Sequence, residues 1–110
     1  MNQYLYQIRL KRLEMLTEGP TEPETNVLQD HVSYLERLAQ ESVVLLAGRT
    51  QNVDADGFGI VILRAGSECE AQQIMEQDPA VKEGVMHARL FPYKIAVLSD
   101  AILENQDEPS

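Results

Sequence analysis

The sequence predicts an α+β fold in which two helices cover one face of a four-stranded antiparallel sheet. Three observations predict it: period-two alternation at residues 3–13, helical spacing of apolar residues at 21–41 and 67–77, and continuous apolar runs at 43–50 and 58–63. With one more strand toward the C-terminal end, the order is β-α-β-β-α-β, the ferredoxin-like arrangement. In this arrangement the first and third strands are central, and the second and fourth strands form the sheet edges.

The first strand and the first helix carry clear local signals. In residues 3–13 a set rich in tyrosine and aliphatic side chains alternates with a more polar set, as expected of a strand with one better-buried face. The helix at 21–41 opens with Thr21 and Glu24 at capping-box spacing, and Pro23 lies in the first turn, where a missing N–H costs nothing.

The remaining elements follow from turn and breaker residues. A short turn ending in Asp56 and Gly57 joins the runs at 43–50 and 58–63, which predicts an antiparallel pair. The second helix opens at Ser67 and ends before Pro79, since the residue before proline avoids helical geometry. The last strand spans 85–98 and contains Pro92, which cannot donate to a ladder and therefore belongs on a sheet edge. We expect the apolar positions of the second helix, Cys69 included, to pack inward.

Composition and charge narrow the class of protein. The chain has 110 residues, 44% hydrophobic and 25% charged, which is ordinary for one globular domain. We assign residues 1–98 to this domain and 99–110 to an acidic tail whose last residues, 105–110, fray. The net charge of −9 repels phosphate backbones, so no nucleic-acid partner is expected.

Features that the sequence lacks indicate where the protein is located and whether it needs a metal or a cofactor. No apolar run approaches the roughly 20 residues of a membrane span, and residues 1–12 lack the apolar core of a signal peptide. A single cysteine favours a reducing cytoplasm. The two histidines and the cysteine show no metal-ligand spacing, so neither a metal nor a cofactor is expected.

The second and third strands are apolar on both faces, although two helices can cover only one face of the sheet. At about 25 cal/mol per Å² of apolar area, leaving several such side chains in water forgoes several kcal/mol. We therefore predict a two-fold homodimer packed sheet against sheet. The alternative is that the N-terminal loop or the acidic tail covers this face.

His31 is the candidate reactive residue. Its ionisable ring lies in the middle of the apolar stripe of the first helix, and a polar group on a buried face needs a partner or a task. A histidine in this setting also occurs as a core residue bonded to a backbone carbonyl, and that alternative stays open.

Four local patterns resemble the YciI-like (YCII-related) family of small bacterial proteins. The patterns are His31-Val32-Ser33-Tyr34-Leu35, Ala47-Gly48, Asp56-Gly57-Phe58-Gly59, and Asp78-Pro79-Ala80-Val81 with Gly84-Val85. The resemblance covers residues 4–97 and implies a ferredoxin-like fold, dimerisation as an α+β barrel and a His/Asp active site. The stretch between the first strand and the first helix, 13–26, matches no motif of the family.

The fold makes contact between His31 and Asp78 plausible. His31 lies about 15 Å along the first helix from Thr21, and Asp78 lies about 17 Å along the second from Ser67. We expect both helices to start at the same end of the sheet, which would place the two residues at the same level. A carboxylate bonded to one ring nitrogen fixes the tautomer and leaves the other nitrogen as general base. Asp78 before Pro79 is also a helix N-cap, and both roles can coexist.

Three further residues are candidate substrate contacts: Tyr34, Gly48 and Arg49. Tyr34 lies one turn after His31, but an aromatic side chain there also suits core packing. Gly48 allows a close approach to the backbone at a strand end, where a bulge is the alternative. Arg49 suits an acidic substrate, or else is a solvated edge charge.

These residues favour a small-molecule enzyme of the lyase or isomerase type, with His31 as base and Asp78 as its orienting partner. No serine or cysteine is placed as a nucleophile, which favours acid–base over covalent chemistry. One alternative is a non-catalytic ligand-binding or protein-interaction module, in which no open cavity touches His31. A further alternative is a haem-degrading or quinone-forming monooxygenase, since other dimeric α+β barrels perform such reactions.

Overall fold

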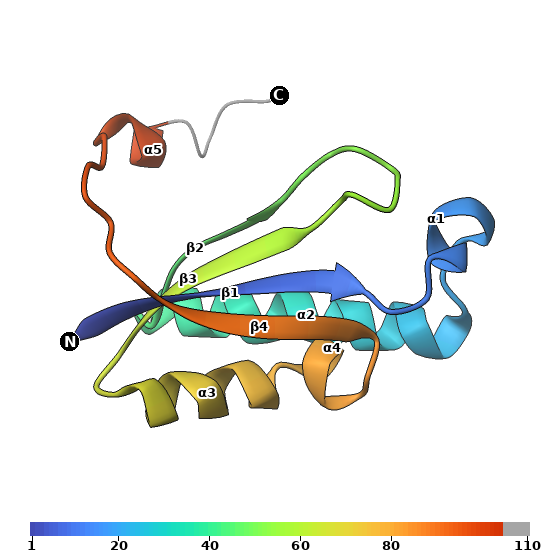
Figure 1. The fold of residues 1–110 in the computed structure, drawn as a ribbon, viewed down its shortest axis with the longest axis horizontal. Coiled ribbons are helices and arrows are strands. Elements are labelled where there is room, and N and C mark those ends of the chain that lie inside the picture. The colour runs from blue at the N-terminus through green and yellow to red at the C-terminus, as the bar shows by residue number, and fades with distance from the viewer. Residues whose placement is uncertain (105–110) are drawn as a thin grey trace.

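The computed structural model describes residues 1–104 and places two layers, with helices on one face of a four-stranded antiparallel sheet (Figure 1). The sheet order is β2-β3-β1-β4, so the predicted fold class and the central position of the first and third strands are confirmed. The elements are β1 (Asn2–Leu10), α1 (Glu14–Glu18), α2 (Glu22–Gln40), β2 (Val44–Arg49), β3 (Gly59–Ala65), α3 (Glu68–Gln77), α4 (Pro79–Lys82), β4 (Met86–Tyr93) and α5 (Ala101–Glu104). None of the helices among residues 1–104 combines the length and apolarity that crossing a membrane requires.

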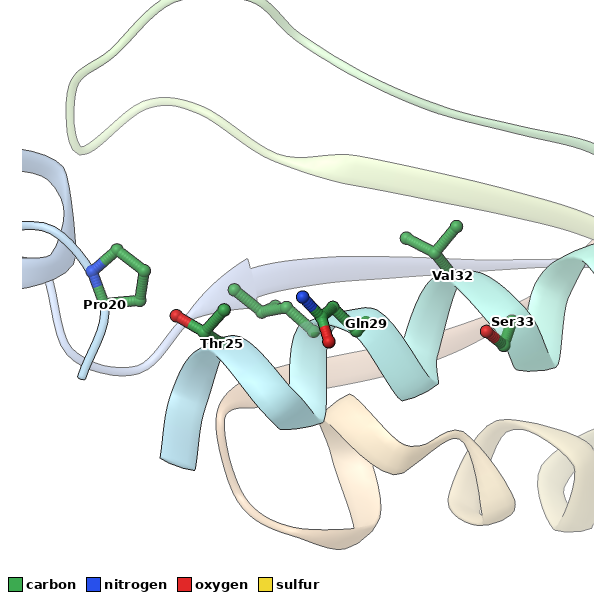
Figure 2. A pocket seen from close by; sticks show the side chains of 6 residues that line it. Pro20, Thr25, Gln29, Val32 and Ser33 are labelled. Carbon is green, nitrogen blue, oxygen red and sulfur yellow. The ribbon is translucent and has the colours of Figure 1, made fainter. Parts of the chain in front are cut away.

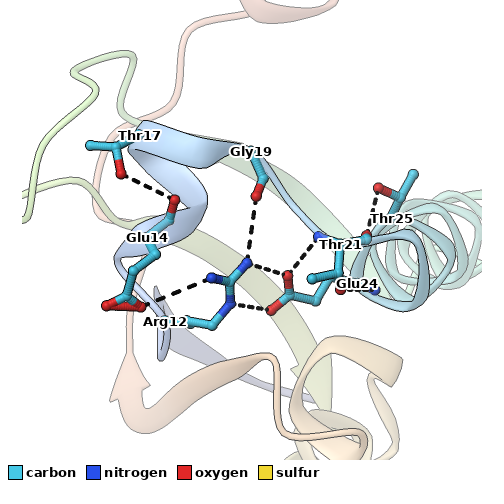
Figure 3. A network of polar contacts seen from close by, with 7 residues as sticks. All are labelled: Arg12, Glu14, Thr17, Gly19, Thr21, Glu24 and Thr25. Carbon is cyan, nitrogen blue, oxygen red and sulfur yellow. Dashed lines mark hydrogen bonds and ion pairs between the residues drawn. The ribbon is translucent and has the colours of Figure 1, made fainter.

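The start of α2 is fixed by a network of polar contacts around Glu24 (Figure 3). The Thr21 hydroxyl accepts from the Glu24 N–H at 3.3 Å, and the Thr21 N–H donates to Glu24 Oε1 at 2.8 Å, so the predicted capping box is confirmed. Arg12 donates to both Glu24 oxygens, at 2.7 and 3.0 Å. The hydrogen bond from Arg12 makes the largest contribution and the one from Thr21 the next largest, and together they lower the pKa of Glu24 to about 2. The end of β1 is thereby bound to the first turn of α2.

The core lies between the sheet and the helices. Tyr4, Tyr6 and Ile8 of β1 are buried on the helix side, and Tyr6 pairs in register with Val61 of β3. From the helix layer, Leu38 of α2 and two residues of α3 complete the cluster. Burying apolar area between a sheet and helices is the dominant favourable term in the folding of such a domain. β1 is therefore one of the two central strands and supplies three residues of this core.

The other face of the sheet has no helix of the α2–α4 layer over it and is partly apolar. Leu5 pairs with Ile62 on one side and with Phe91 on the other, and Ile62 is nearly buried within one chain. A bulge between Val44 and Leu46 interrupts the β2 ladder, and Leu45 is 40% exposed. The segment after β4 leads to this side of the sheet, where α5 lies (Figure 1).

Several element bounds differ from the expected ones. The first strand was expected to reach residue 13 but ends at Leu10, and the last was expected to reach residue 98 but ends at Tyr93. Each strand ends where its partner does: Leu10 pairs with Met86, the first residue of β4, and Tyr93 pairs with Gln3, near the start of β1. The Ile95 N–H bonds the Gln3 side chain instead, at 2.7 Å.

Cys69 and the segment between β1 and α2 also differ from what the sequence indicated. The inward packing expected of Cys69 is wrong, because Cys69 is exposed in the first turn of α3. The helix α1 in the stretch without a motif was not expected at all. The predicted fraying of residues 105–110 lies outside the described residues.

Candidate active site

Asp78 forms the junction between α3 and α4 and is fully buried. Pro79 has no N–H and cannot continue α3, so the chain turns at Asp78, whose backbone is extended (φ −59°, ψ 123°). The Asp78 side chain then caps α4, with Oδ1 accepting from the Ala80 N–H at 3.0 Å. This cap confirms one of the two roles expected for Asp78, and it holds the carboxylate in a fixed orientation beneath the sheet.

His31 meets this carboxylate from α2. Its Nδ1 lies 2.7 Å from Asp78 Oδ1, and only 11% of its side chain is exposed. The expectation that both helices start at the same end of the sheet is wrong: β1 and β3 are antiparallel, so α2 and α3, which follow them, start at opposite ends (Figure 1). The two residues meet because His31 lies near the middle of α2, and this part of α2 passes beside the C-terminal end of α3, where Asp78 follows. The structure therefore brings together the two residues, 47 positions apart, that the sequence singled out.

Tyr6 is a third member of the cluster. Its hydroxyl donates to Asp78 Oδ2 at 2.7 Å, and the side chain is fully buried on the helix side of β1. Burial, and then the negative charge of Asp78, raise the pKa of Tyr6, so the hydroxyl keeps its proton and acts as a donor. The sequence analysis missed this role. The sequence did contain an indication of it: Tyr6 belongs to the buried side chains of a central strand, and a buried tyrosine hydroxyl needs a hydrogen-bond partner.

The second ring nitrogen of His31, Nε2, remains open. Within residues 1–104, Nε2 has no hydrogen-bond partner, and none of the buried side-chain nitrogens or oxygens there is unsatisfied. Nε2 is therefore not completely enclosed, since a fully buried nitrogen without a partner would be unsatisfied. A histidine held at Nδ1 by a carboxylate and open at Nε2 has the arrangement of a general base.

Tyr34 lies beside the cluster but uses its hydroxyl elsewhere. The hydroxyl donates to the backbone carbonyl of Ile74 at 2.6 Å and so ties α2 to α3. Partial burial, and then the charge of Asp78, raise the pKa of Tyr34 to about 12. Gly48 and Arg49 lie on the exposed edge strand β2, and none of the hydrogen bonds described for residues 1–104 joins them to His31 or Asp78.

A hollow of about 480 Å³ runs along α2 next to this site (Figure 2). Its lining includes Leu28 and Val32, and Val32 is 53% exposed. His31 is not among the lining residues, although Val32 directly follows it in the helix. Among residues 1–104, no group of three or more His, Cys, Asp or Glu side chains is placed to hold a metal ion.

Comparisons with known proteins agree with this fold. The YCII-related domain model matches residues 7–93. Similar solved structures include 5-chloro-2-hydroxyhydroquinone dehydrochlorinase (TftG) from Burkholderia phenoliruptrix AC1100, in complex with 2,5-dihydroxybenzoquinone. It is 22% identical, covers 83% of this chain and 93% of its own, and superposes with a TM-score of 0.58, which supports a shared fold alone. Among curated proteins, none matches the sequence.

Proposed function

The chain belongs to the YCII-related domain family, as its motifs predicted, and we propose that it is a small-molecule enzyme in which His31 moves a proton with the help of Asp78. One observation carries this proposal: a fully buried carboxylate bonded to Nδ1 of a histidine whose Nε2 has no hydrogen-bond partner among residues 1–104. A buried charge costs several kcal/mol unless its environment compensates, which favours a functional reason for keeping it.

The proposed chemistry is of the lyase or isomerase type. Nε2 takes a proton from a carbon next to a carbonyl group, and the electron pair of the broken C–H bond delocalises into that carbonyl. In an isomerisation the imidazolium returns the proton to another atom of the substrate. In an elimination the electron pair expels a leaving group from the neighbouring carbon. Asp78 stabilises the imidazolium in both cases.

The substrate contacts remain part of the proposal. We keep Gly48 and Arg49 as the residues that meet a substrate extending toward the β2 edge. Tyr34 contributes its ring, because its hydroxyl is already bonded to Ile74. The similar dehydrochlorinase binds a hydroxylated quinone, and a small oxygen-rich ring of this kind is a reasonable first class of compound to test.

We further propose that two copies pair through the helix-free sheet face, in the cytoplasm. Leu5, Ile60 and Phe91 are partly exposed on this face in a single chain. Covering them with a second copy removes apolar area from water without closing the His31 side of the molecule, because the helices lie on the opposite face.

A second candidate is a binding module without catalysis. It is favoured by one observation: the hollow beside α2 is lined by Val32 and Ser33 and not by His31. In that case the His31–Asp78 bond serves only to join α2 to α4, and a small molecule binds unchanged.

The test is hydrogen exchange on small carbonyl compounds. Pyruvate, acetoacetate and 2,5-dihydroxybenzoquinone are incubated with the protein in D₂O, and deuterium uptake at carbon is followed by NMR. We expect uptake with the parent and with His87→Ala, the matched control, since His87 is exposed on β4. We expect none above background with His31→Ala. Equal uptake by His31→Ala and the parent contradicts the proposed function.

A further inference from the structure

We propose that Tyr6 is a positioning residue that keeps the proton shared by His31 and Asp78 on the ring nitrogen Nδ1. This inference rests on the proposed function of the pair and adds a third residue to it. The consequence is chemical: after Nε2 takes a proton, the ring remains an imidazolium and can give that proton back.

The first step is the number of donors that converge on Asp78. The Ala80 N–H and the Tyr6 hydroxyl approach different oxygens, at 3.0 and 2.7 Å, and His31 Nδ1 lies 2.7 Å from the oxygen that Ala80 uses. The Ala80 N–H can only donate. A carboxylate accepts at both oxygens, so all three contacts are satisfied together when Asp78 is ionised and Nδ1 carries a proton.

The second step concerns the direction of the Tyr6 bond. Tyr6 is fully buried, and among residues 1–104 its hydroxyl forms a hydrogen bond with Asp78. If Asp78 carried a proton on Oδ2 and donated it to Tyr6, the Tyr6 proton would have no acceptor. Burying an unsatisfied donor is costly. Tyr6 therefore donates, and its bond stabilises the ionised form of Asp78.

The third step is the state after proton abstraction. The ring then holds protons on both nitrogens, and the Nδ1 proton can stay on the ring or pass to Asp78. If it passes, the ring becomes neutral with its remaining proton on Nε2, which is a poor acid. The Tyr6 bond opposes this transfer, because it is stronger when Asp78 is an anion. Losing a hydrogen bond to a charged group shifts such an equilibrium by about tenfold to a hundredfold.

Tyr4 offers a matched control on the same strand. Tyr4 and Tyr6 lie two residues apart, both face the helices, and both belong to the core cluster. The Tyr4 hydroxyl makes no hydrogen bond to any residue in the described range 1–104, and so none to His31 or Asp78. Tyr4→Phe and Tyr6→Phe therefore remove the same group from the same core, and only Tyr6→Phe removes a donor to Asp78.

The experiment is NMR of protein labelled with ¹⁵N-histidine and ¹³C-aspartate, at mildly acidic pH and without a ligand. In the parent and in Tyr4→Phe, we expect the Nδ1 resonance of His31 to show a bound proton and the Asp78 carboxyl carbon to lie in the ionised range. In Tyr6→Phe, we expect the Nδ1 resonance to move toward the unprotonated range and the Asp78 carboxyl carbon toward the protonated range. His87, exposed on β4, serves as internal reference and stays unchanged.

Unchanged His31 and Asp78 resonances in Tyr6→Phe would overturn the inference. If Tyr6→Phe does not fold, ring-fluorinated tyrosine at position 6 keeps the volume and the hydroxyl while strengthening the donor. A Nδ1 resonance that does not respond to fluorination then overturns the inference as well. The NMR measurement does not depend on turnover and therefore tests the role of Tyr6 separately from the proposed function. An active His31→Ala variant would refute the proposed function, and the NMR result would still support or overturn the role of Tyr6.

Discussion

Replacing Asp78 by asparagine is the perturbation whose size follows most directly from the structure. The substitution keeps the shape of the side chain and removes one acceptor and the charge. Two donors, from His31 and Ala80, use Oδ1, and the Tyr6 hydroxyl uses Oδ2. If the amide oxygen occupies the Oδ1 position, its NH₂ group faces Tyr6, whose own buried proton then has no acceptor.

The expected loss of stability has two parts. A buried unsatisfied donor costs about 1–3 kcal/mol, and the two remaining bonds lose about 1 kcal/mol by becoming neutral. Removing a fully buried charge offsets part of this loss. We expect Asp78→Asn to lower the free energy of unfolding by about 2 kcal/mol, which corresponds to roughly 10 °C in Tm for a domain of this size.

The effect on activity should be larger than the effect on stability. In the opposite orientation, with its NH₂ group at the Oδ1 position, the amide donates to His31 Nδ1, which moves the ring proton to Nε2 and removes the base; in either orientation the charge that stabilises the imidazolium is lost. Replacing a carboxylate that orients a histidine by an amide lowers kcat by on the order of 10⁴-fold in a comparable triad. The assay is deuterium uptake at carbon by the compound that responds to the parent.

Asp30→Asn is the control for Asp78→Asn, because Asp30 directly precedes His31 and is exposed. It removes the same charge and should leave both Tm and uptake within experimental error. If Asp78→Asn matched Asp30→Asn in both measurements, Asp78 would be neither a stabilising acceptor nor the partner of His31. The reasoning from hydrogen-bond geometry would then be refuted.

Three further perturbations test other parts of the structure. Because Arg12 lowers the pKa of Glu24 from 4.5 to about 2, this pair stabilises the fold above about pH 4.5 and ceases to do so as the pH falls through 2. Glu24→Gln should flatten that part of the curve of Tm against pH, and an unchanged curve contradicts this. Tyr34→Phe removes the bond to Ile74 and should cost about 1 kcal/mol in urea unfolding, whereas an unchanged midpoint would show the bond to be neutral. Ile60→Glu places a charge on the helix-free face and should convert the dimer to a monomer, as measured by analytical ultracentrifugation. A variant that dimerises with the same dissociation constant as the parent argues against that interface.

The fold could be predicted because local signals and topology agreed. The Thr21–Glu24 capping box fixed where α2 begins, and Pro79 fixed where α3 ends. The contact between His31 and Asp78 was predicted from a wrong premise, because the count of residues assumed that both helices start at the same end of the sheet, whereas α2 and α3 run in opposite directions. By contrast, Pro92 indicated an edge strand, and β4 is one.

The features that the sequence analysis missed depend on long-range contacts or on weak local signals. The partnership of Tyr6 with Asp78 spans 72 positions and exists only because β1 lies in the middle of the sheet. The helix α1 has five residues and no side-chain cap, which leaves little pattern to recognise. The inward packing expected of Cys69 was wrong because helical spacing alone does not say which flank of a short helix is covered.

Neutron diffraction from deuterated crystals, at a pH where His31 is neutral, tests the central claim most directly, because it locates the deuterium atoms of the cluster. We expect deuterium on His31 Nδ1 and on the Tyr6 hydroxyl, with both oxygens of Asp78 and His31 Nε2 bare. Deuterium on His31 Nε2 with none on Nδ1, or on either oxygen of Asp78, would contradict the assignment of His31 as a general base held by a buried carboxylate.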